Sequence, residues 1–140
     1  MVSQLLINKL MEMEGLRQEA YVDAAGVLTI GYGHTKKVRK GDKISKYWAK
    51  ELLMQDLAEV EKQVKALGVA KTQGQLDALV SFAFNLGIGN LKRSTLLKCI
   101  KEQRSMREIK RQFMRWVYAD NKILKGLQRR REWEAKRFFE

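Results

Sequence analysis

Apolar residues recur every three or four positions over most of this chain, which is the spacing of helices that bury one face. Near the start, Leu6, Leu10 and Met13 share such a stripe. Ser3 is placed to cap a first helix and Gly15 is placed to end it. Glu14 then falls in the last turn. The pattern predicts an N-terminal helix that carries an acid at its C-terminal end.

A longer apolar stripe predicts a second helix, which begins at Ser45 and ends at Gly68. Its inward-facing residues are expected to be Trp48, Leu52, Leu53, Leu57, Val60, Val64 and Leu67. A helix of this length can join two lobes, and we expect it to do so.

Further along, a Thr or Ser is twice followed three residues later by Gln or Glu, which is the pattern of a capping box at a helix start. The pairs are Thr72 with Gln75 and Ser105 with Glu108. The apolar residues behind them, expected in the core, are Leu76, Leu79, Val80, Ala83, Phe84, Ile109, Phe113 and Trp116. Short helices near 94–101 and 127–139 would complete a helical lobe.

Between residues 20 and 32 the helical period is lost, and β-forming residues flank the small turn residues Ala24, Ala25 and Gly26. A short β-hairpin is therefore expected. The predicted fold class is α+β and mainly helical. A small N-terminal lobe would hold the hairpin, and the long helix would join it to a larger helical C-terminal lobe.

The 140 residues suffice for one hydrophobic core, since 45% of them are hydrophobic, and proline is absent. We expect a single domain over 1–140, with a hairpin lobe of about 14–60 and a helical lobe formed by 1–13 and 61–140. A groove between two such lobes could hold a polymer strand.

The net charge is +12, and residues 101–140 alone hold 13 Lys and Arg against 6 Asp and Glu. This excess favours a polyanionic partner, either a bacterial wall or a nucleic acid. The alternative is a solvated face of an amphipathic helix, formed by Arg104, Arg107, Lys110, Arg111 and Arg115. Charge alone does not choose between these interpretations.

One cysteine and one histidine limit the possible chemistry. Cys99 has no partner for an internal disulfide, and it lies on an apolar helical face, where it is expected to be a small core residue. With His34 as the single histidine, a zinc site of the usual ligands is hard to assemble. No metal and no cofactor are expected. The three tryptophans, Trp48, Trp116 and Trp133, are expected to anchor the core.

Three residues near the start carry candidate chemistry. Glu14, Asp23 and Thr29 follow one another at intervals of nine and six residues, across the end of the first helix and the hairpin. Hydrolysis of a glycosidic bond needs a proton donor and a second carboxylate that activates water or attacks the sugar. The negative end of a helix dipole favours a protonated carboxyl, as suits Glu14, whereas Asp23 beside an open turn should stay ionised.

The surrounding residues resemble the phage-type lysozymes, the endolysin muramidases of the T4-like and lambdoid phages. The matching residues are Gly15, Tyr21 and Gly26, the runs 29–35, 75–87 and 94–97, and finally Trp116 with 126–130. The resemblance spans residues 5–135 and implies a lysozyme-like fold. It also implies that Glu14 is the general acid, and that Asp23 and Thr29 position the water, usually with inversion at the anomeric carbon.

The resemblance assigns further roles. Residues expected to line or support a saccharide groove are Tyr32, Thr35, Phe84, Asn85 and Thr95. His34 would be structural and paired with a carboxylate, while Arg129 and Arg130 would be mainly structural. Asn121 stands where many relatives have glycine, which asparagine can replace because it tolerates left-handed geometry.

The implied function is that of a monomeric endolysin that hydrolyses the β-1,4 bond between N-acetylmuramic acid and N-acetylglucosamine in peptidoglycan. The chain shows neither a membrane-spanning apolar run nor a secretory signal, so we expect it in the host cytoplasm before lysis, without stable membrane insertion. A partner holin, implied by the family, would then release it to the wall.

Two functions of other classes stay open. A basic helical nucleic-acid-binding protein would account for the charge but not for the acid, acid and hydroxyl pattern. A non-catalytic peptidoglycan-binding module would share the fold, but the intact trio argues against it. A tail-associated enzyme that penetrates the wall would use the same chemistry by another delivery route.

Overall fold

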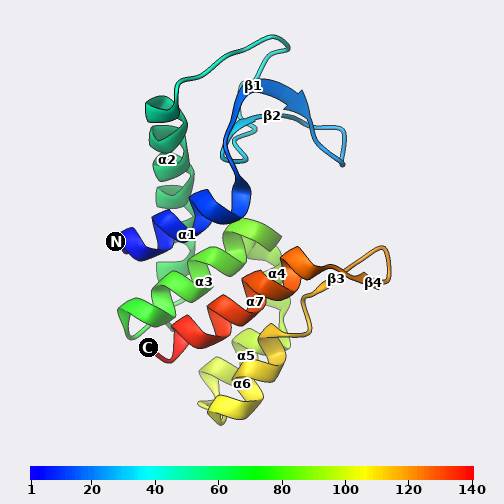
Figure 1. Ribbon diagram of the computed structural model, residues 1–140. Coiled ribbons are helices and arrows are strands. Elements are labelled where there is room, and N and C mark those ends of the chain that lie inside the picture. Colours follow the sequence, from blue (N-terminus) through cyan, green and yellow to red (C-terminus); the bar gives the residue numbers. More distant parts are fainter. The chain divides into compact units, whose positions relative to one another are not determined.

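The computed structural model describes residues 1–140, and it confirms a mainly helical fold with a small antiparallel hairpin (Figure 1). Its elements are α1 (Gln4–Glu14), β1 (Arg17–Val22), β2 (Leu28–Gly31), α2 (Lys46–Lys65), α3 (Gln73–Leu86), α4 (Ile88–Arg93), α5 (Thr95–Lys101), α6 (Met106–Phe113), β3 (Tyr118–Ala119), β4 (Lys122–Ile123) and α7 (Lys125–Phe138).

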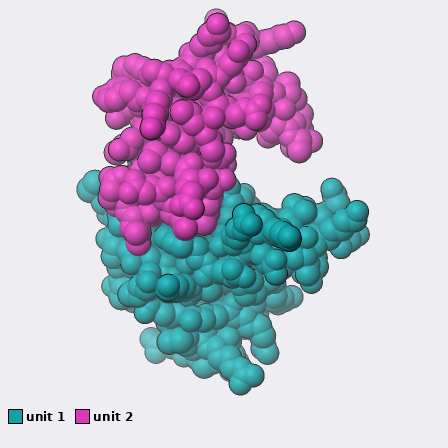
Figure 2. Space-filling view, viewed as in Figure 1, with its two compact units in different colours: residues 1–3, 60–140 teal, residues 4–59 magenta.

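The chain divides into two compact units, coloured separately in Figure 2. Unit 1 holds Met1–Ser3 and Val60–Glu140, and unit 2 holds Gln4–Glu59. Helix α2 begins in unit 2 and ends in unit 1. Helix α1 belongs to unit 2 with the hairpin, whereas the sequence had suggested that residues 1–13 go with the helical lobe.

In unit 2, α1 ends where the sequence predicts. Gly15 adopts a φ of +72°, which favours glycine, and its N–H donates to the carbonyl of Met11 at 3.1 Å. Leu6 and Leu10 are fully buried. The apolar stripe therefore fixes the helix by burial, and the glycine places Glu14 at its final residue.

Strands β1 and β2 pair antiparallel, with Tyr21 opposite Thr29 and Val22 opposite Leu28. The turn between them closes through a hydrogen bond from the N–H of Gly26 to the carbonyl of Asp23, 3.0 Å long. Gly26 has a φ of +82°, so the expected hairpin and its turn residue are both confirmed.

Helix α2 begins after Ser45, whose hydroxyl accepts the N–H of Trp48 at 3.1 Å. The sequence prediction that Trp48 faces inward is wrong, because its side chain is 59% exposed. The buried stripe consists of Ala49, Leu53, Leu57 and Val64, and residue 48 lies outside it. The last turns also differ slightly, since α2 ends at Lys65 and Gly68 closes a following turn.

In unit 1, both predicted capping residues cap helices. Thr72 accepts the N–H of Gln75 at 3.1 Å, and Ser105 accepts the N–H of Glu108 at 3.2 Å. The return contact of the first box is shifted by one residue, because the Gln75 side chain accepts from Lys71. These caps start α3 and α6.

The core of unit 1 forms where α3 packs against α7. Phe82 meets Phe113 and Trp116 edge to face, with ring centroids 6.1 Å and 5.5 Å apart. Gly74 permits the close approach at one end, because a Cβ there would lie 2.3 Å from the carbonyl oxygen of Arg137. The aromatic contacts therefore join α3 to α6 and to Trp116, while Gly74 lets α3 and α7 approach closely.

A buried ion pair lies within this core. Arg131 and Glu134 are both fully buried, and Nε of the arginine lies 2.8 Å from Oε1 of the glutamate. Oε2 accepts the hydroxyl of Ser81 at 2.6 Å, and the guanidinium donates to the side chain of Asn85 at 2.8 Å. Burial raises the pKa of Glu134 to about 7, against the pull of Arg131 and Ser81. Desolvation also lowers the pKa of Arg131.

A second buried acid secures the N-terminal residues of unit 1. Asp77 on α3 is fully buried and accepts both the N–H and the hydroxyl of Ser3. The same carboxylate accepts Nε and a terminal nitrogen of Arg137 on α7, at 3.1 Å and 2.9 Å. Asp77 therefore joins three separate segments through charge-assisted hydrogen bonds.

Three short elements of unit 1, namely α4, β3 and β4, were not expected from the sequence. The single-turn helix α4 carries no side-chain cap and buries only Leu91, so its sequence signal is weak. The two-residue strands β3 and β4 are joined by Asp120 and Asn121, whose φ angles are +52° and +64°. Asn121 therefore takes the left-handed geometry that its place in the turn had suggested. No helix is long and apolar enough to cross a bilayer.

We predict that Glu134→Ala lowers the free energy of unfolding by about 3–5 kcal/mol, because Arg131 would remain buried without its carboxylate. Glu132→Ala, on the exposed face of the same helix, should change it by less than about 0.5 kcal/mol. Urea unfolding followed by circular dichroism measures both values. Equal losses for the two variants would contradict this role of the ion pair.

Candidate active site

The first candidate acid lies against the glycine-rich segment after the hairpin. Glu14 is half-buried at the end of α1. A Cβ on Gly33 would lie 3.1 Å from Oε2 of Glu14 and 3.5 Å from its carboxyl carbon. Gly33 also has a φ of +79°. The backbone geometry therefore favours glycine, and an added Cβ would press on the carboxyl of Glu14, which lies close to the backbone there.

The second acid, Asp23, is organised by the turn that follows it. Its Oδ1 accepts the N–H of Ala25 and the N–H of Val27, both at 2.9 Å. This is an Asx turn, in which the side chain substitutes for a backbone acceptor. Oδ2 makes no hydrogen bond within the protein, so it can accept a hydrogen bond from a donor outside the protein.

Thr29 lies beside Asp23 through a shared backbone group. Its hydroxyl donates to the carbonyl of Val27 at 2.9 Å, and the same carbonyl accepts the N–H of Asp23 at 3.0 Å. The peptide groups of Val27 therefore hold both side chains. Because the Thr29 proton is used in this way, the hydroxyl oxygen offers only its acceptor lone pairs to a further partner.

The register of the hairpin places Tyr21 on the same face as this pair. Tyr21 stands opposite Thr29, and side chains two residues apart along a strand point to the same side. The guanidinium of Arg17 lies 4.1 Å from the centroid of the Tyr21 ring, within the range of a cation–π contact. Arg17 is therefore engaged with this ring in unit 2.

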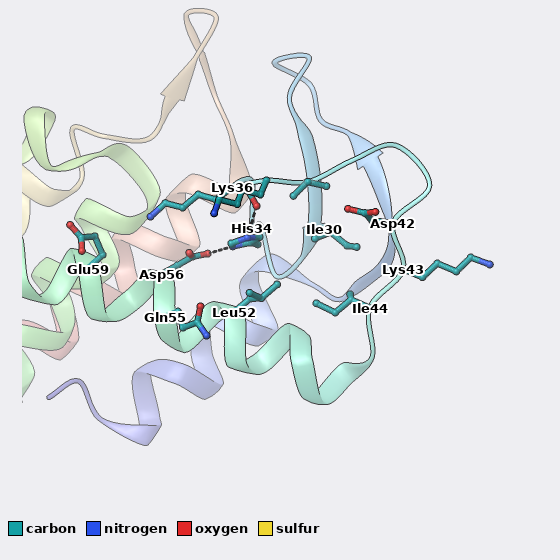
Figure 3. Close-up of a pocket in the computed structure, with 12 residues that line it drawn as sticks. Ile30, His34, Lys36, Asp42, Lys43, Ile44, Leu52, Gln55, Asp56 and Glu59 are labelled. Carbon is teal, nitrogen blue, oxygen red and sulfur yellow. Dashed lines mark hydrogen bonds and ion pairs between the residues drawn. The ribbon is translucent and has the colours of Figure 1, made fainter.

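His34 is held between α2 and the segment that follows β2. Nδ1 lies 2.9 Å from Oδ2 of Asp56 on α2, and Nε2 lies 2.9 Å from the carbonyl oxygen of Lys36 (Figure 3). The ring is buried and held at both nitrogens. The predicted pairing of His34 with a carboxylate is confirmed, and such a ring has a positioning role for the segment after β2.

The five groove residues proposed from the sequence fall in both units. Tyr32 and Thr35 belong to unit 2, where Tyr32 is 4% exposed and Thr35 is exposed. Phe84, Asn85 and Thr95 belong to unit 1. Asn85 accepts a hydrogen bond from Arg131, so its side-chain oxygen already has a partner.

Two residues that organise the site were not identified from the sequence. Val27 acts through its peptide groups, which no side-chain pattern reveals. Asp56 lies 22 residues from His34, and nothing in the local sequence marks it as the partner. In contrast, the two glycines in the run 29–35 are a sequence signal for a close approach of the backbone, which the structure shows between Gly33 and Glu14.

Arg131, rather than its neighbour Arg130, is the fully buried arginine of the 126–131 segment. Arg129 is exposed and Arg130 is half-buried. Cys99 is buried as a free thiol, and no group of three or more His, Cys, Asp or Glu side chains has the geometry to hold a metal ion.

Unit 2 thus presents two distinct functional groups. The first is a half-buried carboxyl at the end of a helix, with a tight contact beneath it. The second is a pair of side chains, the carboxylate of Asp23 and the hydroxyl of Thr29, which are both hydrogen-bonded to Val27. A carboxyl that can give a proton and a pair that can hold water are the groups that hydrolysis of an acetal requires.

Known proteins that resemble this chain in sequence are lysozymes and endolysins. Residues 11–134 match the family described as Phage lysozyme. The endolysin of Bacillus phage B103 is 41% identical over 141 residues, covering 98% of this chain and 53% of that protein. The SAR-endolysin of Bacteriophage PS119 is 40% identical over 124 residues, covering 87% of this chain and 74% of that protein. This chain spans about half the length of the Bacillus phage relative.

Solved structures show the same fold. The muramidase domain of SpmX from Asticaccaulis excentricus superposes with a TM-score of 0.91 at 34% identity, covering 100% of this chain and 98% of that one. A P22 lysozyme variant gives a TM-score of 0.82 at 32% identity, covering 99% of this chain and 98% of that one. The expected lysozyme-like fold is therefore confirmed.

Proposed function

This chain belongs to the phage lysozyme family, and we propose that it is a muramidase. Its substrate would be the β-1,4 bond between N-acetylmuramic acid and N-acetylglucosamine in peptidoglycan. The observation that carries the proposal is the arrangement around Val27, whose N–H bonds to Oδ1 of Asp23 and whose carbonyl accepts the hydroxyl of Thr29. Oδ2 of Asp23 and the lone pairs of the Thr29 hydroxyl are left without a donor in the protein. Names of similar proteins, among them endolysins and a muramidase domain, support the same conclusion.

The arrangement suits a water molecule that attacks a sugar. Water has two protons and two lone pairs. One proton would be donated to Oδ2 of Asp23 and the other to the hydroxyl oxygen of Thr29, whose own proton already bonds to Val27. A lone pair is then left to face the anomeric carbon, and Asp23 takes the proton as the carbon–oxygen bond forms.

Glu14 would supply the other half of the reaction. As the glycosidic bond breaks, its electron pair stays on the leaving oxygen, which takes the carboxyl proton of Glu14. The attacking water approaches from the opposite face, so the configuration at the anomeric carbon inverts. One new reducing end results, and a proton transfer through solvent returns Glu14 and Asp23 to their starting forms.

The biological role that we propose is lysis of a bacterial host by an endolysin. Peptidoglycan is the substrate partner, while the holin, the host cytoplasm before lysis and the monomeric state stay predictions. The groove residues Tyr32, Thr35, Phe84, Asn85 and Thr95 also stay predictions. Incubation with purified peptidoglycan, followed by mass analysis, tests the whole proposal, because a muramidase releases muropeptides with new reducing ends. Binding without such products would indicate a non-catalytic module.

We expect Glu14→Gln to fold normally and to lose activity by about 10²–10⁴-fold, because an amide cannot donate the required proton. Glu12→Gln, on the same helix with an exposed side chain, removes the same charge and should keep near-normal activity. The release of reducing ends from peptidoglycan measures both. Near-normal turnover by Glu14→Gln would refute the assignment of the general acid.

Thr29→Val keeps the shape of the side chain but removes the oxygen that would accept from water, so kcat should fall about 10²-fold. Thr29→Ser restores the hydroxyl and should recover most of the rate. Full activity of Thr29→Val would exclude Thr29 from water positioning.

Gly33→Ala should displace the carboxyl of Glu14, because the new Cβ would lie 3.1 Å from Oε2. The matched control is Gly41→Ala, at a φ of +85° with no atom within 4 Å of the added Cβ. Left-handed geometry should cost each variant about 1–2 kcal/mol of stability. Only Gly33→Ala should lose about tenfold or more in kcat, because a displaced catalytic group is out of line. Equal activities would show that this contact does not position the acid.

A further inference from the structure

The segment 36–51 of unit 2 has an unusual charge balance. It holds seven Lys and Arg residues against two acids, Asp42 and Glu51. The seven are Lys36, Lys37, Arg39, Lys40, Lys43, Lys46 and Lys50. None of them forms an ion pair within the protein, whereas Lys9, Lys65, Arg104 and Arg137 elsewhere each pair with a glutamate or aspartate. The segment therefore carries uncompensated positive charge.

These cations lie close together along the chain, although Lys36 and Lys43 extend in opposite directions from it (Figure 3). Six of them lie in the loop between His34 and α2 or at the first residue of that helix, and all six are exposed. Lys50 follows one turn later and is half-buried. In the close-up of unit 2, Lys43 points away from the protein, into solvent (Figure 3). Exposed like charges without internal partners favour a partner of opposite charge.

An exposed aromatic pair stands in the same segment. Tyr47 is 65% exposed and Trp48 is 59% exposed, and their rings meet edge to face with centroids 5.2 Å apart. Two large aromatic side chains outside the buried stripe of α2 contribute nothing to the core. Such rings offer a flat apolar face and a polar edge, which suit the C–H faces and hydroxyls of sugars and polyols.

A cavity of about 530 Å³ lies beside these cations, within unit 2. Lys36, Lys37 and Lys43 are among its lining residues, and its apolar lining comes from Ile30, Val38, Ile44 and Leu52. Two of its three carboxylates already have partners, since Asp56 bonds to His34 and Asp42 accepts the N–H of Arg39 at 2.8 Å. The surface is therefore hollowed as well as basic, with Glu59 as the one further acid in the lining.

We propose that the seven cations with Tyr47 and Trp48, named here the basic–aromatic surface, bind a phosphodiester-linked polymer of sugars or polyols in the bacterial cell wall. Phosphates would contact the cations, and the sugar or polyol units would lie on the aromatic pair. This inference rests on the proposed function, which brings the protein to the wall. A polymer with one phosphate charge per repeat can engage many cations at once.

The test is co-sedimentation with purified Gram-positive cell walls, before and after hydrofluoric acid removes their phosphodiester polymers. The surface variant is Lys40→Gln/Lys43→Gln/Lys46→Gln. Its control, Lys101→Gln/Arg107→Gln/Arg111→Gln, removes three exposed charges from unit 1, so both variants have the same net charge. We expect the surface variant to bind untreated walls about tenfold more weakly, and the control to bind like the wild type.

Two further results are expected. Extraction of the phosphodiester polymers should lower wild-type binding to the level of the surface variant. Trp48→Ala should weaken binding several-fold at both low and high salt, because an apolar stacking contact is not screened as the ionic contacts are. Equal losses in both charge variants, or wild-type binding that survives extraction unchanged, would overturn the proposal. The proposal would also be overturned if the surface variant bound duplex DNA more weakly than the wild type but bound walls equally well.

Cleavage of the extracted peptidoglycan separates this inference from the proposed function. Wild type, surface variant and control should all release reducing ends from it at similar rates, since no phosphodiester polymer remains to be bound. Absence of cleavage by the wild type would refute the muramidase activity while leaving the wall-binding result standing. Cleavage with no effect of the surface variant on untreated walls would refute the binding surface alone.

Discussion

The hydrogen bonds around Val27 determine what the hairpin of unit 2 can do. The N–H groups of Ala25 and Val27 fix Oδ1 of Asp23, and the carbonyl of Val27 accepts both the N–H of Asp23 and the hydroxyl proton of Thr29. The hairpin register then sets Tyr21 on the same face. A two-stranded hairpin is only marginally stable by itself. The hydrogen bonds of the turn add the support that holds the side chains of Asp23 and Thr29 in position.

In unit 1, helices α3 and α7 approach closely and also bury charged side chains between them. Gly74 removes the one side chain that would keep α3 and α7 apart, and Arg131, Glu134 and Ser81 satisfy most of each other's polar atoms. The raised pKa of Glu134 shows the cost of this burial. Such a pair adds little net stability, but it penalises any other packing of the helices, because that would leave a buried charge alone.

The features that were predicted from the sequence are local ones. Thr72 and Ser105 cap helices, Gly15 ends one, and Gly26 turns the hairpin, because each depends on backbone geometry within a few residues. Trp48 was misplaced, because hydrophobicity alone assigned it to the core and the neighbouring stripe through Ala49 decided otherwise. The trio of the candidate site was recognised through a family pattern, whereas its support by Val27 and the pairing of His34 with Asp56 depend on the folded chain.

The same reasoning accounts for the distribution of positive charge. Within unit 1, Arg131 and Arg137 are tied to acids and serve packing, so they add nothing that a partner could use. The cations of the 36–51 segment are not tied to any acid, and the loop has no core of its own for them to support. Charge that stabilises nothing inside the protein, and that stands beside two exposed rings, is best understood as facing outward. In a wall hydrolase, an anionic polymer held at this loop would keep the enzyme near new substrate between cleavage events.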